Sequence, residues 1–562
     1  MTRRTDVLVV GGGVTGVGVA RDLAMRGADV VLVERDRLAE GTTGRMHGLL
    51  HSGARYAVAD PESAEQCIRE NAILRDVASH CVEDTGGMFV SLAGDDQEYF
   101  QEKLAACEAA GIPTDQVTPD VARQIEPELA ETVERAFLVP DAAIDPFRLV
   151  AANAASAENH GATILTGHDV TDIDVSGGTV EGVTVATESG DTEEIEAAHV
   201  VNAAGPWVDA VLDGLSVDVP VEPAKGAMAV TNSRPVDTVV NRCRPKGEGD
   251  ILVPHETTAI LGTTDEPIDD PDDFDESRRE IEFLTEELAE MVPSLTDARL
   301  IRSYWGVRPL YDPDADGGDS TATSRDFAVL DHEARDGIAG LTTVLGGKLT
   351  TYRLMAERVA DEVGDKLDLQ RGCRTGTEPL PGSRGEVDVR EIMDRYEVRS
   401  PVGARTSERL GDRTEDVLDS GSPNPVVCEC EAVTAAEIRD AIDTSGPDLG
   451  AVRMQTRATM GTCQGGFCSH RLALLLPAEY DQETVWEELE ALLAERWRGQ
   501  RFSLDGDHLS QVALNRALYH LSLNVRQATS GRVDLDFERY DGGQPRGELS
   551  SGHEGGSQEG TR

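Results

Sequence analysis

Lysine, aromatic residues and long apolar segments are all scarce in this sequence. Only five lysines occur among 562 residues, so arginine supplies nearly all of the 52 basic side chains. Acidic residues number 104, and the formal net charge is −52 at pH 7. Such a surface repels phosphate backbones and anionic lipids, which argues against nucleic-acid binding and polybasic membrane anchoring. No apolar run reaches the ~18 residues that a membrane-spanning helix needs.

The acidic residues are spread along the whole chain and do not form a tail. This pattern, with arginine in place of lysine, indicates a protein from an extreme halophile with an arginine-biased genome. An acidic enzyme of a mesophile is the alternative. The sequence runs directly into a strand-like segment without a signal peptide, so we expect a cytoplasmic protein.

Cysteine is also too infrequent for a disulfide scaffold, because nine occur in this length. Four of them cluster as Cys428-Glu-Cys430 and Cys463-Gln-Gly-Gly-Phe-Cys468. Two pairs of thiolates can hold a zinc ion or a [2Fe–2S] cluster. A single residue between Cys428 and Cys430 is unfavourable for zinc, and Gly465 and Gly466 offer backbone N–H groups to sulfur. The spacing therefore favours [2Fe–2S], with zinc the second option.

A glycine-rich turn follows the first predicted strand, at residues 6–10. Gly11, Gly13 and Gly16 form G-x-G-x-x-G before a helix predicted over 17–26, and Glu34 closes the next strand. This is the context of a dinucleotide-binding fingerprint, in which Gly11 allows the turn, Gly13 admits the pyrophosphate and Gly16 allows the helix to pack. The motif alone permits NAD or FAD, and Glu34 disfavours NADP.

Three further segments favour FAD. Gly41–Arg45 follows the Glu34 strand, Val201–Trp207 is a strand that runs into a glycine turn, and Gly346–Thr351 opens another helix. A helix N-terminus at the last segment can stabilise negative charge on a reduced flavin.

Basic groups beside glycines point to an anionic substrate. Arg55, Arg308, Arg325 and Lys348 suit a phosphate or carboxylate if they converge in a cleft. The alternative is that each arginine is a surface ion-pair partner of a nearby acid. His47 and His51 are four residues apart, but no third metal ligand is evident nearby, so we expect His51 to act as a general base or substrate donor.

Together these segments resemble the FAD-dependent glycerol-3-phosphate dehydrogenases. The matching stretches, in the family's order, are the N-terminal fingerprint, His51–Tyr56, Gly262–Asp265, Gly306–Pro309, Thr323–Asp326 and Gly346–Arg353. The cysteine segment is similar to the bacterioferritin-associated ferredoxin family, and the combination resembles the large subunit of the anaerobic enzyme. His51-Ser52 replaces the His-Gly of the aerobic form, which supports the anaerobic branch.

The resemblance implies oxidation of sn-glycerol 3-phosphate to dihydroxyacetone phosphate by FAD in glycerol catabolism, with electrons leaving through an iron–sulfur centre. It further implies partner subunits that carry electrons to a membrane quinone, and a place at the inner face of the cell membrane. The alternatives are an amino-acid or sarcosine-type flavin oxidase and a non-catalytic electron-transfer subunit. The implied catalytic residues are His51, Arg55, Tyr56, Arg308, Arg325 and Lys348. The implied cofactor-binding residues are Gly11, Gly13, Gly16, Glu34, Arg35, Thr42, Thr43, Gly44, Arg45, Ala203, Gly205, Gly347, Lys348, Leu349 and Thr350. The implied metal ligands are Cys428, Cys430, Cys463 and Cys468.

The expected fold is α/β and α+β. A Rossmann-type FAD-binding domain interleaved with a DAO-like substrate domain occupies residues 1–370. A linker region at 371–424 leads to the [2Fe–2S] domain at 425–475. A helical C-terminal region follows at 476–540, and a disordered tail at 541–562 ends the chain. Further helices are predicted over 62–80, 96–110, 276–291, 353–367 and 483–526.

Overall fold

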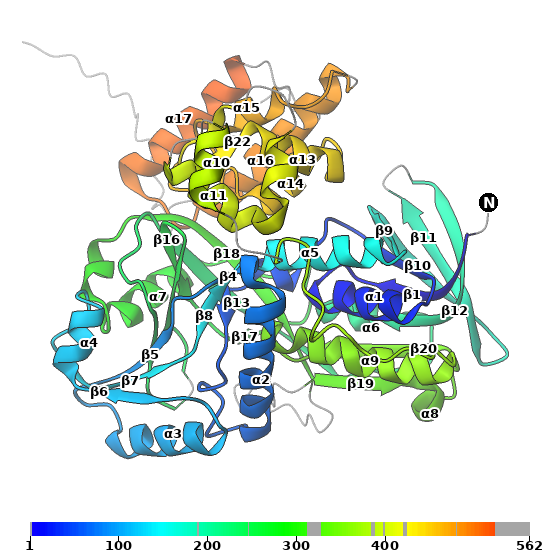
Figure 1. Cartoon of the computed structure of the whole chain (residues 1–562), viewed down its shortest axis with the longest axis horizontal. Coiled ribbons are helices and arrows are strands. Elements are labelled where there is room, and N and C mark those ends of the chain that lie inside the picture. Colours follow the sequence, from blue (N-terminus) through cyan, green and yellow to red (C-terminus); the bar gives the residue numbers. More distant parts are fainter. Residues whose placement is uncertain are drawn as a thin grey trace, which may run out of the picture. The chain divides into compact units, whose positions relative to one another are not determined.

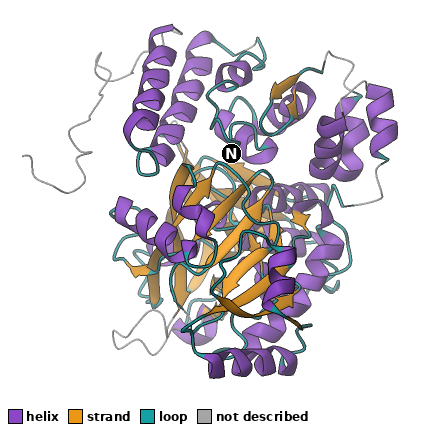
Figure 2. Cartoon of the chain, turned by 90° about the vertical axis from the view of Figure 1, so that its left-hand side faces the viewer, coloured by secondary structure: helices purple, strands orange, loops and turns teal. Residues whose placement is uncertain are grey.

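The computed structural model describes residues 3–187, 190–245, 247–311, 327–383, 388–396, 400–419, 424–478 and 480–522. The chain divides into two compact units, Met1–Asp505 and Gly506–Arg562. Figure 2 shows that strands dominate the N-terminal part of the first unit and that its C-terminal part is mainly helical.

The first large sheet has a parallel centre. It contains β1 (Arg3–Val10), β2 (Val30–Glu34), β9 (Thr163–Thr166), β10 (His168–Ser176), β11 (Thr179–Thr187), β12 (Thr192–Asn202), β19 (Phe327–Asp331) and β20 (Leu341–Gly346). β1 lies between β2 and β12 and pairs in parallel with both. Val7–Val10 are all buried, because both faces of this sheet are covered. The predicted Rossmann-type centre is therefore present.

Helices α1 (Val14–Arg26), α5 (Pro146–Asn159) and α9 (Tyr352–Lys366) lie together over one face of this sheet (Figure 1). Their apolar side chains form one core with the strands, which includes Val17, Leu23, Leu149 and Val359. Helix α1 ends at Gly27, whose φ of 99° closes it in the left-handed conformation.

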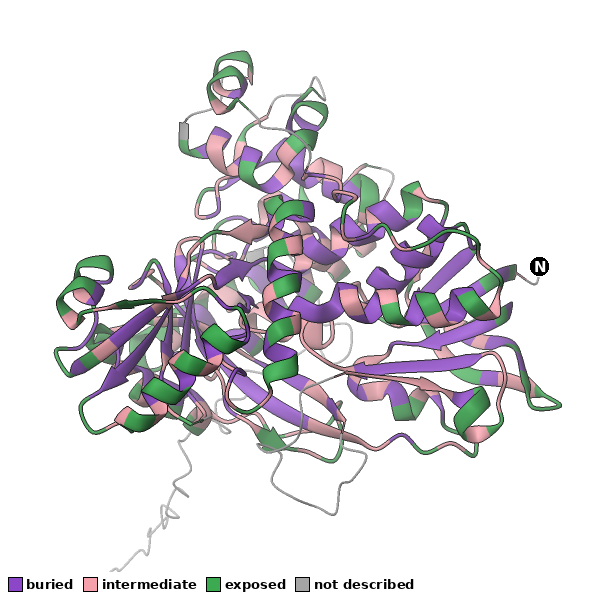
Figure 3. Cartoon of the chain, turned by 60° about the horizontal axis from the view of Figure 1, so that its bottom comes forward, coloured by how far each residue is buried: buried purple, intermediate pink, exposed green. Residues whose placement is uncertain are grey.

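The second large sheet is mostly antiparallel. It contains β5 (Gly87–Leu92), β6 (Asp115–Val117), β7 (Val133–Val139), β13 (Val221–Thr231), β14 (Val239–Arg242), β15 (Ile251–His255), β16 (Thr258–Gly262), β17 (Glu266–Pro267) and β18 (Leu300–Tyr311). Its strands come from segments that alternate along the chain with those of the first sheet, which confirms the expected interleaving. Helix α7 (Arg278–Ala289) buries Ile281, Leu284 and Leu288 against this sheet. Figure 3 shows that strands of both sheets are buried over much of their length.

A small third sheet carries the segment before His51. It consists of β3 (Leu49–Leu50), β8 (Ala142–Ile144) and β4 (Val82–Glu83), with β8 in the middle. The other helices of this region are α2 (Pro61–Val77), α3 (Gln97–Ala109), α4 (Pro119–Ile125), α6 (Val208–Val211) and α8 (His332–Asp336). The predicted helices over 62–80, 96–110, 276–291 and 353–367 correspond to α2, α3, α7 and α9.

The range 371–424, expected as a linker, contains helices. These are α10 (Val389–Tyr396), α11 (Ser400–Leu410) and α12 (Thr414–Leu418). Ile392, Val417 and Leu418 pack with Ala436 in a small core of their own. The apolar side chains behind this packing are sparse along a polar sequence, which is why composition alone indicated a linker.

The cysteine region is small and mainly helical. It contains β21 (Val426–Cys428), β22 (Val433–Thr434), α13 (Ala435–Ser445), α14 (Leu449–Thr456) and α15 (Ser469–Ala473), followed by α16 (Gln482–Gln500). The second unit contributes α17 (Gly506–Ser522). The predicted helix over 483–526 is thus interrupted after α16, and the predicted tail at 541–562 lies outside the described residues.

Candidate functional site

The turn between β1 and α1 needs glycine at two positions for packing reasons. Gly11 has φ of 108°, and a Cβ there would lie 2.6 Å from the Ala203 carbonyl oxygen. A Cβ at Gly16 would lie 1.9 Å from the Gly11 carbonyl oxygen. The turn, the start of α1 and the Ala203 segment are therefore fixed against one another by backbone contact.

Gly13 is different, because the space above it is not filled by packed protein. A Cβ at Gly13 would meet only the Thr43 hydroxyl oxygen, at 3.2 Å. Gly13 is the N-cap of α1 and offers no side-chain cap, while the Val14 N–H donates to the Thr43 hydroxyl over 3.1 Å. An open helix N-terminus lined by glycine is the arrangement that accepts a dinucleotide pyrophosphate.

Glu34 ends β2 beside this turn. Its carboxylate accepts the Gly12 N–H at 2.6 Å and the Asp36 N–H at 2.9 Å. Burial raises the pKa of Glu34, although both N–H donors oppose the rise. Two backbone donors thus fix the carboxylate beside the turn between β1 and α1.

The other predicted cofactor residues surround the same edge of the first sheet. Thr42, Gly44 and Arg45 belong to the short helix Thr42–Arg45, and the Thr42 hydroxyl donates to the Val307 carbonyl over 2.5 Å. The Ala203 N–H donates to the Val10 carbonyl over 2.9 Å, which places the turn that contains Gly205 at the end of β1. Gly347, Lys348, Leu349 and Thr350 lead from β20 into α9. Arg35 lies 4.5 Å from the Trp207 ring and pairs with Asp272 over 2.8 Å.

A cavity of about 330 Å³ adjoins the Thr42–Arg45 helix. Among its lining residues are His51, Arg55, Tyr56 and Arg308, which lie far apart in the sequence. Thr42, Arg45, Met46, His47, Gly226, Met228, Gly247, Glu248, Ile251, Thr263, Asp265 and Gly306 complete the lining. Arg325 lies outside the described residues.

Arg308 and Arg55, two of the three arginines that line the cavity, have acidic partners in it or beside it. Arg308 contacts Asp265 over 3.1 Å and donates to the Thr263 hydroxyl and the Thr264 carbonyl, each over 2.9 Å. Arg55 contacts Asp250 over 2.7 Å. Burial alone would lower the pKa of Arg55, but the charge and hydrogen bond of Asp250 outweigh it and raise that pKa. The ion-pair interpretation and the cavity position therefore both apply to these arginines.

His51 is held from two sides. Its backbone N–H donates to the Thr350 hydroxyl over 3.0 Å, and its Nε2 lies 3.5 Å from the Tyr56 hydroxyl. The next residue, Ser52, donates its N–H to buried Asp141 over 2.7 Å. The imidazole is buried at 7% exposure and faces the cavity.

Lys348 approaches the cavity behind Tyr56. Its ammonium lies 4.5 Å from the centre of the Tyr56 ring and donates to the Ser63 hydroxyl over 2.9 Å. It is absent from the cavity lining, so the structure brings it near His51, Arg55, Tyr56 and Arg308 without placing it beside the cavity itself.

The prediction omitted several lining residues. Asp265 ends the Gly262–Asp265 stretch that resembles the family. Its carboxylate belongs to the cavity because it contacts Arg308. His47 also lines the cavity, and the centre of its ring lies 5.9 Å from that of His51. Glu248 carried no sequence signal. Burial raises its pKa, and it faces Arg308 and Asp265.

Of the four clustered cysteines, Cys428 ends β21, Cys430 follows it, Cys463 lies in the next loop and Cys468 is the N-cap of α15. The pKa of the Cys463 thiol is lowered to about 5, first by the Cys468 thiol and also by the N–H groups of Phe467 and Gly465. Cys468 likewise lowers the pKa of Cys428, with the N–H groups of Thr459 and Glu431 contributing. The Thr462 hydroxyl points at the Cys430 sulfur over 3.6 Å. These are the N–H and O–H donors that stabilise cluster thiolates.

Gly465 and Gly466, within the second cysteine pair, direct their backbone N–H groups to Cys463. The Gly465 N–H helps to lower the pKa of the Cys463 thiol, and the Gly466 N–H donates to the Cys463 carbonyl over 2.9 Å. In the described residues, no three His, Cys, Asp or Glu side chains are grouped as ligands of one metal ion. A [2Fe–2S] cluster does not require such a group, because each iron takes two thiolates. The donor set therefore fits this cluster.

Two family models match the chain. Residues 6–353 match the FAD dependent oxidoreductases, and residues 426–477 match the BFD-like [2Fe-2S] binding domain. The class is thus a flavin-dependent oxidoreductase with an iron–sulfur domain in the same chain. The expected cofactors, FAD and [2Fe–2S], are confirmed by these matches.

Relatives define the family more narrowly. The chain is 54% identical to the A1 subunit of anaerobic glycerol-3-phosphate dehydrogenase from Haloferax volcanii, over 97% of this chain and 95% of the relative. It is 43% identical to the corresponding subunit of the Escherichia coli K12 enzyme, over 92% of this chain and 96% of the relative. The chain belongs to this family of anaerobic glycerol-3-phosphate dehydrogenase subunits, which confirms the resemblance inferred from the motifs.

A solved structure supports the fold. The FAD complex of glycerol-3-phosphate dehydrogenase from Bacillus halodurans has a TM-score of 0.61 at 22% identity, and the match covers 93% of this chain and 95% of that one. Among the residues described for the present chain, no helix combines the length and apolarity required to cross a bilayer.

Proposed function

We propose that this chain oxidises sn-glycerol 3-phosphate to dihydroxyacetone phosphate with FAD, and passes the electrons to its own iron–sulfur centre. The observation that carries this proposal is the cavity beside the Thr42–Arg45 helix, whose lining includes Arg55, Arg308, His51 and Tyr56. The names of the relatives point to the same substrate.

Different cavity residues bind the substrate and accept its proton. FAD, when bound, supplies the acceptor for the hydride from C2 of the substrate. Arg55 and Arg308 bind the phosphate, because guanidinium groups offer paired donors to phosphate oxygens. His51 accepts the C2 hydroxyl proton, and Tyr56, 3.5 Å from its Nε2, orients the ring. Lys348 adds positive charge behind Tyr56.

Anaerobic flavin bleaching tests the reaction. Glycerol 3-phosphate should bleach the bound flavin, whereas glycine and sarcosine should not. Bleaching by the amines alone would establish an amine oxidase, and no bleaching by any of them would establish an electron-transfer subunit. The cluster signal should appear in EPR spectra after glycerol 3-phosphate is added.

We further propose that partner subunits take the electrons from the cluster to a membrane quinone, with this chain peripheral at the cytoplasmic face of the membrane. The subunit names of the relatives support a multi-subunit enzyme. Two large apolar side chains are exposed near the cysteines. Phe467 directly precedes Cys468 and is 68% exposed, and Leu474 directly follows α15 and is 78% exposed. No acidic residue occurs between Asp448 and Glu479, which is unusual in a chain with net charge −52.

A partner of similarly acidic surface would be repelled least at this acid-free stretch. Phe467→Ser should therefore slow electron delivery to native membrane vesicles but not to ferricyanide. Phe283→Ser, at another exposed phenylalanine (37% exposed), is the matched control. Equal delivery to vesicles by both variants would contradict the exit surface.

A further inference from the structure

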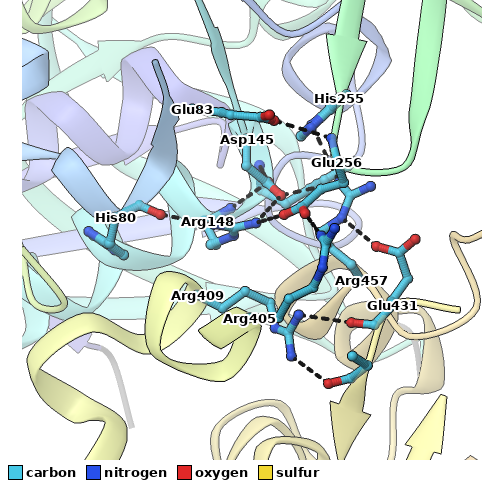
Figure 4. A network of polar contacts seen from close by, with 12 residues as sticks. His80, Glu83, Asp145, Arg148, His255, Glu256, Arg405, Arg409, Glu431 and Arg457 are labelled. Carbon is cyan, nitrogen blue, oxygen red and sulfur yellow. Dashed lines mark hydrogen bonds and ion pairs between the residues drawn. The ribbon is translucent and has the colours of Figure 1, made fainter. Parts of the chain in front are cut away.

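A buried arginine joins the cysteine region to the flavin-binding part of the first unit. Arg457 follows α14, and its guanidinium lies 3.1 Å from Glu431, 3.3 Å from Asp145 and 3.4 Å from His255 Nε2 (Figure 4). These four residues are at most 7% exposed. Glu431 directly follows the cluster ligand Cys430, whereas Asp145 and His255 belong to the N-terminal part.

The backbone at Arg457 indicates that its side chain is needed there. Its φ is 63°, in the left-handed region where glycine is the usual residue after a helix. An arginine is sterically unfavourable in this conformation, so the contacts of its side chain must offset the backbone strain.

The charges around Arg457 are paired throughout. Arg148 contacts Asp145 and Glu256, Arg405 contacts Glu256, and Arg409 donates to the Glu431 carbonyl over 2.9 Å (Figure 4). Burial and Arg457 lower the pKa of His255 to about 3, so this ring is neutral and accepts from Arg457. Arg457 is a cation that Asp145 and Glu431 share, and its loss would remove it from Glu431 and leave Asp145 with Arg148.

The contacts of Arg457 lead to the flavin segment on one side. Asp145 caps α5 and follows Ile144, whose N–H donates to the Gly48 carbonyl over 2.7 Å. Gly48 lies between the predicted FAD-binding residue Arg45 and His51. Asp145 is thus one residue away from a backbone hydrogen bond to the segment that carries both.

A cavity of about 110 Å³ shows how closely the two parts approach. Gly44, Arg45 and Met46 line it from the flavin segment, Met460 lines it from just before the second cysteine pair, and Gln464 lines it from within that pair. Arg457 and His255 line the same cavity. Arg457 therefore lies where the flavin segment and the second cysteine pair line the same cavity.

We propose that Arg457 is a positioning residue of the electron-exit route, which holds the cluster loop against the flavin segment and stabilises the reduced cluster by its charge. This inference deepens the proposed function and rests on electron transfer from the flavin to the cluster. Reduction adds a negative charge to the cluster, and a nearby cation favours that state. Loss of Arg457 should therefore lower the midpoint potential and also disturb the distance between the sites.

Redox titration of the intact protein, followed by EPR, tests the charge effect. Arg457→Gln should move the cluster midpoint potential to a more negative value, and Glu431→Gln should move it to a more positive one. Arg457→Lys keeps the charge, so its potential should stay near that of the unmodified chain. Arg413→Gln is the matched control, because Arg413 pairs with Asp440 of α13 at the surface of the same region.

Rapid freeze-quench EPR after mixing with glycerol 3-phosphate tests the positioning effect. Cluster reduction should slow several-fold in Arg457→Gln and less in Arg457→Lys, while flavin bleaching keeps its rate. Equal potentials and equal rates in Arg457→Gln and Arg413→Gln would overturn the proposal, as would shifts of the same sign in Arg457→Gln and Glu431→Gln. If Arg457→Gln fails to fold, Glu431→Gln and Arg457→Lys decide the question.

The titration uses dithionite and needs no substrate. A failure of the substrate assignment would therefore appear as absent bleaching in the unmodified chain, with the predicted potential shifts still present. A failure of the Arg457 proposal would appear as unshifted potentials in a chain that glycerol 3-phosphate bleaches normally.

Discussion

Removal of the Arg308 guanidinium should weaken glycerol 3-phosphate binding more than the loss of one contact suggests. A charge-assisted hydrogen bond contributes about 1.5–3 kcal/mol, so Arg308→Ala should lower kcat/KM about 10- to 100-fold. The same change also removes the Arg308 charge from the Asp265 carboxylate, whose side chain is 6% exposed. That carboxylate would then repel the phosphate, which places the loss at the upper end of this range.

The double variant Arg308→Ala/Asp265→Asn separates the two effects. It lacks the phosphate contact but also lacks the Asp265 negative charge, so it should recover part of the lost kcat/KM. Asp265→Asn alone should lower KM, because it removes a competitor for the guanidinium. Arg335→Ala, which breaks a pair with Asp336 at the surface, should leave the kinetics unchanged.

The assay is steady-state oxidation of glycerol 3-phosphate with a soluble dye, together with anaerobic bleaching at increasing substrate. The effect should fall mainly on KM and on the substrate concentration for half-maximal bleaching, because the phosphate contact exists before and during the reaction. Flavin content verifies that each variant is folded. Unchanged kinetics in folded Arg308→Ala would refute the phosphate role and leave Arg308 as a structural ion-pair residue.

Four other outcomes are expected. Gly13→Val should abolish FAD retention, because its side chain would fill the space above the helix N-terminus; a folded variant with full FAD content by absorbance would contradict this. Cys463→Ser should lose the [2Fe–2S] signal in EPR and iron analysis while substrate still bleaches the flavin, and stoichiometric zinc without iron in the unmodified chain would favour the zinc option. The melting temperature should rise from low to molar KCl, because salt shortens the Debye length to about 3 Å at 1 M and screens the net charge of −52; a salt-independent melting curve would count against the halophile interpretation. Burial lowers the pKa of His80, His199 and His255 to about 3, 4 and 3. The unfolded chain therefore binds more protons below about pH 6.5, and the free energy of unfolding should fall as the pH drops from there towards 4. Urea titrations across this range should show a shallower fall for His199→Gln, and an equal slope would rule out this histidine as a contributor.

The sequence by itself determined the features that depend on neighbouring residues. Gly11, Gly13 and Gly16 were recognisable because a turn between a buried strand and a helix imposes local spacing, and the cysteine pairs were recognisable for the same reason. The helices that became α2, α3, α7 and α9 were predictable because their apolar positions recur with helical period. The order of the motifs along the chain was sufficient to identify the family.

Only the tertiary structure decided which charges meet. Arg308 contacts Asp265 and Arg55 contacts Asp250 from distant segments of the chain, so flanking residues gave no sign of these pairs. Arg457 reaches Asp145 through a contact between parts of the chain that share no local pattern. Helices α10–α12 form because a few apolar side chains find partners elsewhere, which composition does not reveal. Local patterns are set by backbone geometry, whereas long-range ion pairs depend on how whole elements pack, and that packing decides both the cavity and the contact between the two cofactor sites.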